Sequence, residues 1–189
     1  MMTQSEMKYG QRNSKLLLDE VYFWTDTIKD WHKLLDDDFN KYVIIDCWRN
    51  LVARKKIKLY AFVIMPNHIH AVWEMLSVNG KEMPYASFNK FTGHRFLERL
   101  RIHSSDQIVY YEEYRDEERN HRFWQRDPLA VLMDSRDKVQ QKIEYTHLNP
   151  LQEQWNLVTK PEDYTWSSAR FYETGIDDFN ILTDYRERF

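Results

Sequence analysis

The segment around Met65-Pro66-Asn67 constrains the fold of this chain more than any other. An apolar run at 59–64 precedes it, and a second run, rich in β-branched and aromatic residues, extends to Glu74. Such runs on both sides of a short Pro-Asn segment are typical of two strands joined by a turn. Because successive side chains of a strand alternate between its faces, we expect His68 and His70 to point the same way. Two imidazoles at this spacing can bind one metal ion.

The histidine pair is weak evidence by itself. A His-X-His pair is more often incidental than a metal site, because two ligands do not define a coordination sphere. A single histidine is usually a partly buried side chain that is hydrogen-bonded to a neighbour. The pair gains meaning only together with a second group of residues further along the chain.

The composition is that of an ordinary globular protein, and it excludes several classes. The chain has 189 residues, 30% charged and 42% hydrophobic, which favours one domain with an appended segment. No apolar run is long enough to cross a bilayer and no signal-peptide pattern is present, so we expect a cytoplasmic protein without a membrane partner. The only cysteine, Cys47, excludes an internal disulfide and a cysteine-based zinc cage. A net charge of −3 argues against non-specific coating of nucleic acid but leaves room for a local basic groove.

The hydrophobic periodicity predicts an α+β fold. The expected elements are strands at 21–27, 59–64, 68–74 and 122–127, and helices at 31–54 (broken near Asp36-Asp37-Asp38), 86–101 and 136–148, with an irregular stretch at 102–121. The order β, α, β, β, α, β and a further helix is that of a ferredoxin-like (RRM-like) fold. It has an antiparallel sheet with helices on one face, and here a C-terminal helical addition. The histidines would then lie on a central strand.

The same pattern divides the chain into three parts. We expect a mobile segment at 1–20, a main domain at 21–155 and an extension at 156–189 packed on that domain. Nine cations are candidates for a DNA-binding groove, although each one alone is more often plain surface. They are Arg54, Lys55, Lys56, Lys58, Lys90, Arg95, Arg99, Arg122 and Arg126.

The second informative group lies at the end of the helix predicted over 136–148. Tyr145 and Asn149 are four residues apart, so they project from nearly the same helix face. A tyrosine hydroxyl can act as a nucleophile, and an amide oxygen can be a metal ligand. The alternative is that Tyr145 packs against the sheet and Asn149 ends the helix before Pro150. Spacing alone favours this alternative.

Four blocks of the chain resemble the single-tyrosine HUH transposases, named for a His, bulky hydrophobe, His motif. The subgroup is the REP-associated tyrosine transposases. The blocks, which occur in the expected order, are Pro66-Asn67-His68-Ile69-His70, Trp124-Gln125-Arg126-Asp127, the stretch Ile143-Glu144-Tyr145-Thr146-His147-Leu148-Asn149-Pro150, and Pro161-Glu162-Asp163-Tyr164-Thr165-Trp166-Ser167-Ser168-Ala169. The resemblance extends from about Tyr22 to Tyr172. It identifies 21–155 as the nuclease domain.

This resemblance implies a mechanism and a substrate. His68, His70 and Asn149 would hold Mg²⁺ or Mn²⁺, and Tyr145 would attack the scissile phosphodiester to give a 5′-phosphotyrosine and a free 3′-hydroxyl. The substrates in the family are single-stranded DNA segments next to hairpins, and its members act as monomers or homodimers. We rank His147 below Asn149 as a ligand, because two residues from Tyr145 it should face elsewhere on the helix.

Two other functions compete with this one. A domesticated relative would bind hairpin DNA or RNA without cutting it, although a binder has no chemical need for the whole set of His68, His70, Tyr145 and Asn149. A metal phosphohydrolase would use the histidines without covalent chemistry. Such an enzyme normally needs additional carboxylate ligands, and the sequence shows no motif for them.

Overall fold

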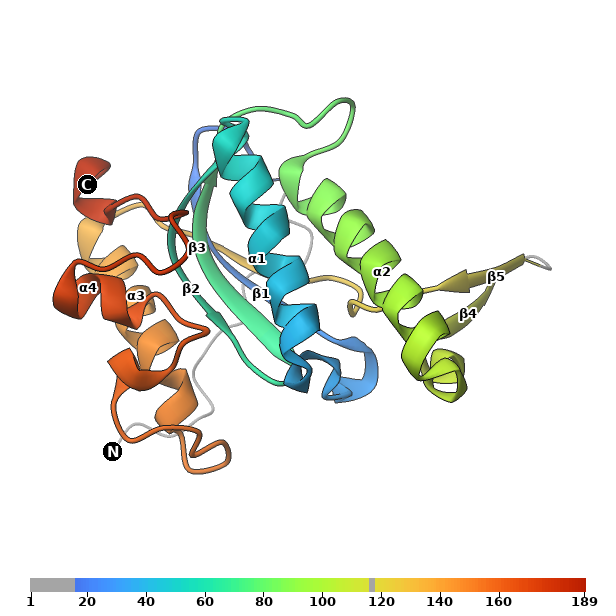
Figure 1. Ribbon diagram of the computed structural model, residues 1–189. Helices are drawn as coiled ribbons and strands as arrows, with labels where there is room; N and C mark the ends of the chain where they lie inside the picture. The colour runs from blue at the N-terminus through green and yellow to red at the C-terminus, as the bar shows by residue number, and fades with distance from the viewer. Residues whose placement is uncertain (1–15, 116–117) are drawn as a thin grey trace, which may run out of the picture.

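A four-stranded antiparallel sheet forms the centre of the protein (Figure 1). The computed structural model describes residues 16–115 and 118–189, so most of the segment predicted to be mobile lies outside the described residues. The strand order is β2-β3-β1-β6. The strands are β1 (Val21–Thr27), β2 (Ile57–Ile64), β3 (His68–Met75) and β6 (Leu129–Leu132). This is the order of a ferredoxin-like fold, and the predicted fold class is confirmed.

Two long helices cover one face of the sheet, as predicted (Figure 1). They are α1 (Asp38–Ala53) and α2 (Pro84–His103). The predicted break near Asp36-Asp37-Asp38 is present, because Asp37 is the N-cap of α1 and its side chain accepts from the Phe39 amide. Before it, the chain forms short 3₁₀ turns at Lys29–Trp31 and Leu34–Asp36 instead of a helix.

The alternation of the strands separates two hydrophobic cores. Tyr22 and Trp24 of β1 and Trp73 of β3 face α1 and α2 in the larger core. Phe23 of β1 and Val72 of β3 face the opposite way, toward a smaller core. This second core is covered by α3 (Arg136–Leu148), the further helix of the prediction. The helix therefore lies on the sheet face to which His68 and His70 also point.

Two other parts of the predicted secondary structure are also wrong. The fourth strand is Leu129–Leu132, not 122–127. Phe123 and Trp124 are consecutive and both are buried in the larger core, which an alternating strand does not allow. Only Trp124 forms a β-bridge there, with Ile28, and Asp127 has a φ of 58° that interrupts extended backbone. The stretch at 102–121 is also more regular than predicted. It contains the end of α2, a 3₁₀ segment and a hairpin, namely Ser105–Tyr111, β4 (Glu112–Arg115) and β5 (Glu118–His121).

The C-terminal extension packs against the outer side of β2. After the 3₁₀ turn Asn149–Leu151 that continues α3, its regular elements are the 3₁₀ turns Pro161–Asp163 and Tyr185–Glu187, and α4 (Ala169–Thr174). Backbone hydrogen bonds join it to β2 at three places. Ile64 N donates to Trp166 O, Ser168 N to Phe62 O, and Thr183 N to Leu59 O.

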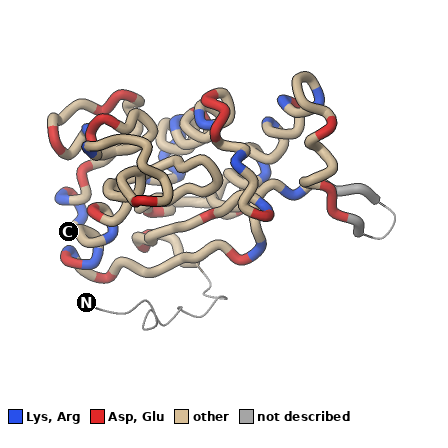
Figure 2. Tube along the Cα trace, turned by 90° about the horizontal axis from the view of Figure 1, so that it is seen from below, with Lys and Arg blue, Asp and Glu red and all other residues tan. Residues whose placement is uncertain are grey.

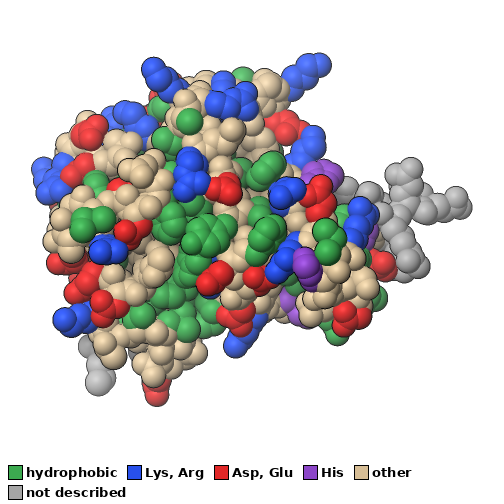
Figure 3. All heavy atoms as spheres, viewed as in Figure 1, with side chains coloured by type: hydrophobic (Ala, Val, Ile, Leu, Met, Phe, Trp, Pro, Cys, Tyr) green, Lys and Arg blue, Asp and Glu red, His purple; other side chains and the backbone are tan. Residues whose placement is uncertain are grey.

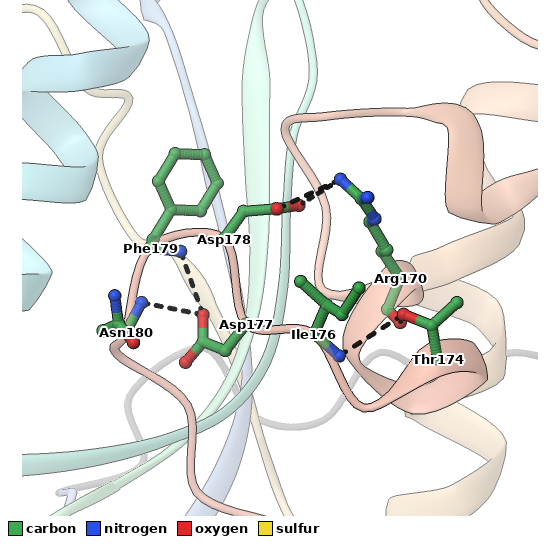
Figure 4. Close-up of polar contacts among 7 residues, drawn as sticks. All are labelled: Arg170, Thr174, Ile176, Asp177, Asp178, Phe179 and Asn180. Atoms are coloured by element: carbon green, nitrogen blue, oxygen red, sulfur yellow. Dashed lines mark hydrogen bonds and ion pairs between the residues drawn. The ribbon is translucent and has the colours of Figure 1, made fainter.

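A turn stabilised by one carboxylate follows α4 (Figure 4). The Asp177 side chain accepts hydrogen bonds from the backbone amides of Phe179 and Asn180 and of the two residues after them. Arg170 of α4 pairs with the neighbouring Asp178. These contacts direct Phe179 onto Trp166, against which its ring stacks with centroids 5.9 Å apart. The extension is therefore held by specific local contacts as well as by β2.

Candidate active site

His68 and His70 lie next to each other on β3, which is an interior strand of the sheet. Their ring centroids are 4.9 Å apart, and both side chains are buried. Phe23 of the neighbouring strand β1 stacks on the His70 ring at 5.2 Å. The regular backbone of an interior strand thus fixes both imidazoles on one face, as the alternation predicts.

Hydrogen bonds orient both rings. His68 Nδ1 lies 2.8 Å from Asn67 Oδ1, and the amide of Asn67 is itself oriented because its Nδ2 donates to Trp31 O. An amide oxygen only accepts, so the proton of the neutral His68 ring is on Nδ1 and the lone pair is on Nε2. His70 Nδ1 lies 2.8 Å from Thr25 Oγ1. Such partners on the second ring nitrogen are typical of histidines that bind a metal.

Burial keeps both imidazoles neutral at physiological pH. It lowers the pKa of His68 to about 4, although a hydrogen bond to Asn149 partly opposes this shift. The pKa of His70 is well below its ordinary value, mainly because of burial and also because His68 and Lys142 are nearby. Neutral imidazole is the form that binds metals.

Helix α3 brings Tyr145 to the histidines. The buried side chains Val139, Ile143 and Thr146 hold one stripe of this helix against the sheet. Tyr145 lies beside that stripe, with its ring 5.3 Å from His70 and 39% of its surface exposed. A side chain that touches the histidine and is still accessible is positioned as an attacking group requires.

Asn149 completes the group at the end of α3. It occupies the C-cap position, and its side chain is buried and hydrogen-bonded to His68. The role as a helix end and the position beside the histidine are therefore compatible. The structure brings all four predicted site residues, His68, His70, Tyr145 and Asn149, into one cluster on the α3 side of the sheet.

Sequence reasoning missed several residues of this cluster. The Lys142 ammonium lies 4.8 Å from the centroid of the Phe23 ring and 5.3 Å from that of Tyr145. Burial lowers the pKa of Lys142. Trp155 flanks His68, with ring centroids 5.7 Å apart. The spacing of Lys142, three residues before Tyr145, was a signal that could have been used.

His147 and the two tyrosines nearest to it in the C-terminal part of the resemblance are engaged elsewhere. His147 Nε2 lies 2.8 Å from Ser168 Oγ, so it faces the C-terminal extension. The hydroxyls of Tyr164 and Tyr172 donate to the backbone carbonyls of Ile64 and Tyr60. Burial raises the pKa of both phenols. Tyr145 is thus the tyrosine that adjoins the histidines.

The basic residues of the first half lie away from the cluster. Three of them, Arg54, Lys55 and Lys56, follow α1. Lys58 is opposite Glu74 in the register of the sheet, at the end of β3 that is far from His68. At a rise of about 3.3 Å per residue this is on the order of 20 Å from His68. Their proximity to the histidine strands in sequence is therefore not proximity in space.

The other cations lie on or near α2, across the sheet from the cluster, and most are paired. Lys90 pairs with Glu82, Arg95 with Glu98, and Arg99 with Asp37. Arg122 and Arg126 share the carboxylate of Glu113. In the view of Figure 2, basic and acidic residues are interspersed over the trace. Of the nine predicted cations, Lys90 and Arg122 line one groove, and Arg95 and Arg99 line another that also contains Glu98.

The cluster has few of the side chains that usually bind metal ions. Within residues 16–115 and 118–189, no group of three or more His, Cys, Asp or Glu side chains could hold a metal ion. The cluster offers two neutral imidazoles and one amide oxygen, which is a mixed set with open positions. Such a set could hold a divalent cation and leave positions open for water or a phosphate oxygen. None of the helices described is long and apolar enough to span a membrane.

Comparisons with known proteins point to the same fold. No protein-family model matches the chain, and no curated protein matches it in sequence. Among solved structures, it is similar to a REP-associated tyrosine transposase bound to a REP hairpin. The likeness covers 91% of this chain and 90% of that chain, with a TM-score of 0.58 and 15% sequence identity. At this identity the likeness establishes the shared fold.

Proposed function

We propose that this protein cleaves and rejoins single-stranded DNA next to hairpins through a covalent bond to Tyr145. The observation that carries the proposal is the partly exposed Tyr145 ring 5.3 Å from the buried, neutral His70. The fold shared with a transposase that was solved with its hairpin supports the choice of substrate.

The proposed reaction is a transesterification at the scissile phosphodiester. The phenolic oxygen of Tyr145 attacks the phosphorus, and the bond from phosphorus to the 3′ oxygen breaks. The 3′ oxygen leaves as a hydroxyl with the proton that the phenol gives up. The product is a 5′-phosphotyrosine, which keeps the phosphodiester energy, so attack by a 3′-hydroxyl can reverse the step without ATP.

The residues around Tyr145 have separate roles in this proposal. Mg²⁺ or Mn²⁺ held by His68, His70 and Asn149 would supply a Lewis acid for the scissile phosphate. Asn67 and Thr25 orient the imidazoles through their Nδ1 atoms. Lys142 lies over the Tyr145 ring, where its charge would attract the incoming phosphate.

The test is formation of a covalent protein–DNA adduct. The full chain is incubated with Mg²⁺ or Mn²⁺ and hairpin oligonucleotides that carry single-stranded flanks from the DNA around the gene. Products are separated on a denaturing gel. We expect an adduct that disappears in Tyr145→Phe and in His68→Ala. Tyr42→Phe is the matched control, because Tyr42 is exposed on α1 across the sheet from the histidines.

Each alternative function gives a different result in this assay. Tight hairpin binding without an adduct in either metal would contradict the proposal and favour a binding protein. Cleavage that persists in Tyr145→Phe would favour a phosphohydrolase without a covalent intermediate. Cleavage by the wild type with an adduct that maps to another tyrosine would remove Tyr145 from the mechanism.

A further inference from the structure

A second site candidate lies on the other side of the sheet, between α2 and residues 121–125. It is an open groove of about 520 Å³. Trp124 ties its two walls together, because its indole Nε1 donates to Thr92 Oγ1 of α2 at 2.8 Å. Gln125 N donates to Thr27 O of β1. The groove therefore has firm walls, and it contains part of the Trp124–Asp127 block that the chemistry at Tyr145 does not use.

The polar lining of the groove is suited to an anion. Lys90, His94, His121 and Arg122 line it, and no Asp or Glu is among its described lining residues. Glu113 and Glu82 lie outside the lining and pair with Arg122 and Lys90. Figure 3 shows histidine side chains on the α2 side of the molecule, with Lys, Arg, Asp and Glu side chains around them. Two cationic side chains and two imidazoles thus lie on one concave surface.

Buried polar atoms at the groove lack partners. Arg122 Nε and Nη1 and Asn89 Oδ1 have no hydrogen bond within the described part of the chain. An unpaired buried donor or acceptor costs free energy, and turning toward a ligand would recover it. The unpaired groups include both donors and an acceptor. A nucleobase offers both kinds of partner on its edges, whereas a phosphate offers only acceptors.

Gly93 is an independent indication of a ligand. It lies inside the helix α2, where a glycine costs about 1 kcal/mol relative to alanine. A Cβ at Gly93 would lie 3.6 Å from Phe123 Cδ2, an ordinary contact, so packing within the protein does not require the glycine. Its missing side chain instead leaves the wall of the groove open for a close approach.

We infer that this groove binds one unpaired nucleotide of a single-stranded nucleic acid. The base lies against the apolar floor of Leu97 and Phe123 and bonds to Asn89 and Arg122, while its phosphate faces the cations. The choice of a nucleic acid rests on the proposed function, but the groove is separate from the Tyr145 cluster. Thr27 pairs with His68 in the sheet and bonds to Gln125, so groove and cluster lie at the same end of the sheet, on opposite faces.

The test uses nuclear magnetic resonance on the full chain carrying Tyr145→Phe, which cannot form the adduct. A five-nucleotide single strand is titrated, and the Gly93 amide and the Trp124 indole N–H are followed. We expect both signals to shift, and the affinity to fall about tenfold or more in Gly93→Leu and in Arg122→Gln. Arg101→Gln, an exposed cation in the last turn of the same helix, should bind as before.

Several results would overturn this inference. One is the absence of a shift at the Gly93 amide. Another is an affinity in both groove variants that equals that of the protein without them. A third is the same set of shifts with inorganic phosphate at the same concentration. Melting curves of the variants identify any loss that is due to misfolding of Gly93→Leu, and Arg122→Gln then decides. Groove binding without any adduct in the wild type would refute the proposed function and leave this inference standing. An adduct without groove binding would do the reverse.

Discussion

The carboxyl group of Asp26 makes a quantitative prediction about stability. Asp26 lies on β1 and is completely buried beneath α2. Burial raises its pKa from 3.8 to about 7, although hydrogen bonds from Asn89 and the Thr27 amide partly oppose the shift. Within the described residues no Lys or Arg forms an ion pair with it. Ionising this group in the folded protein is therefore costly.

The sign and size of the effect follow from proton linkage. The folded protein holds the Asp26 proton up to a pH of about 7, whereas the unfolded chain releases it near 3.8. Stability from this group is therefore present at low pH and is lost as the pH rises through this window. The corresponding cost to the free energy of unfolding is about 2 kcal/mol near pH 5 and about 4 kcal/mol near pH 8.

The variant Asp26→Asn removes the ionisable group and keeps its shape. Asn89 can turn its unpaired Oδ1 toward the new amide, so the hydrogen bond between the two side chains can be retained. We expect the variant to gain about 2 to 3 kcal/mol more at pH 8 than at pH 5, relative to the wild type. Urea unfolding followed by tryptophan fluorescence at both pH values measures this difference.

Asp163→Asn is the matched control, because Asp163 is an exposed carboxylate in a surface turn. It should change stability by less than about 0.5 kcal/mol at either pH. If Asp26→Asn shifted stability equally at both pH values, the Asp26 carboxyl would not titrate near neutrality. The argument from burial would then be wrong.

Two further predictions concern the histidines and Lys142. Burial lowers the pKa of His68 and of His147 to about 4, below the 6.5 of an unfolded chain, so stability should fall as the pH drops from 7 to 5. Each histidine contributes up to about 2 kcal/mol to this fall in the free energy of unfolding. Urea unfolding of His147→Gln should therefore show a smaller fall between pH 7 and pH 5. An unchanged dependence on pH would contradict the linkage argument. Lys142→Met should slow adduct formation about tenfold without lowering the melting temperature, because the charge that attracts the phosphate is lost. An unchanged rate would exclude a role of the charge.

Much of the fold could be predicted because local patterns determine it. The alternation on both sides of Met65-Pro66-Asn67 correctly predicted β2, β3 and the shared face of the two histidines. The pattern failed at 122–127, where Phe123 and Trp124 resemble a strand but are buried by tertiary contacts with α2. Alternation reports the two faces of a sheet, and it cannot detect a segment that packs beside the sheet.

The composition of the candidate site was less accessible to sequence reasoning. Spacing placed Tyr145 and Asn149 on one helix face, but only the family resemblance related them to His68 and His70. The roles of Thr25 and Asn67 in orienting the histidines were missed. Thr25 lies on the neighbouring strand and Asn67 in a turn, and neither position has a recognisable sequence motif. Arg54 and Lys58 were proposed because they adjoin the histidine strands in sequence. The two ends of a strand are far apart because each residue adds about 3.3 Å, so residues near the same strand in sequence can lie at opposite ends of the sheet.

The hydrogen bonds between the C-terminal extension and β2 have a consequence for association. An outermost strand normally presents unpaired backbone groups that recruit other strands and lead to aggregates. In this protein the amides and carbonyls on the outer side of β2 at Leu59, Phe62 and Ile64 are taken by the extension. The strand is almost entirely apolar, so without this cover it would be a strong nucleus for strand-to-strand assembly. The extension thus acts as a built-in guard against self-association, and a chain cut before Trp166 would lose that protection.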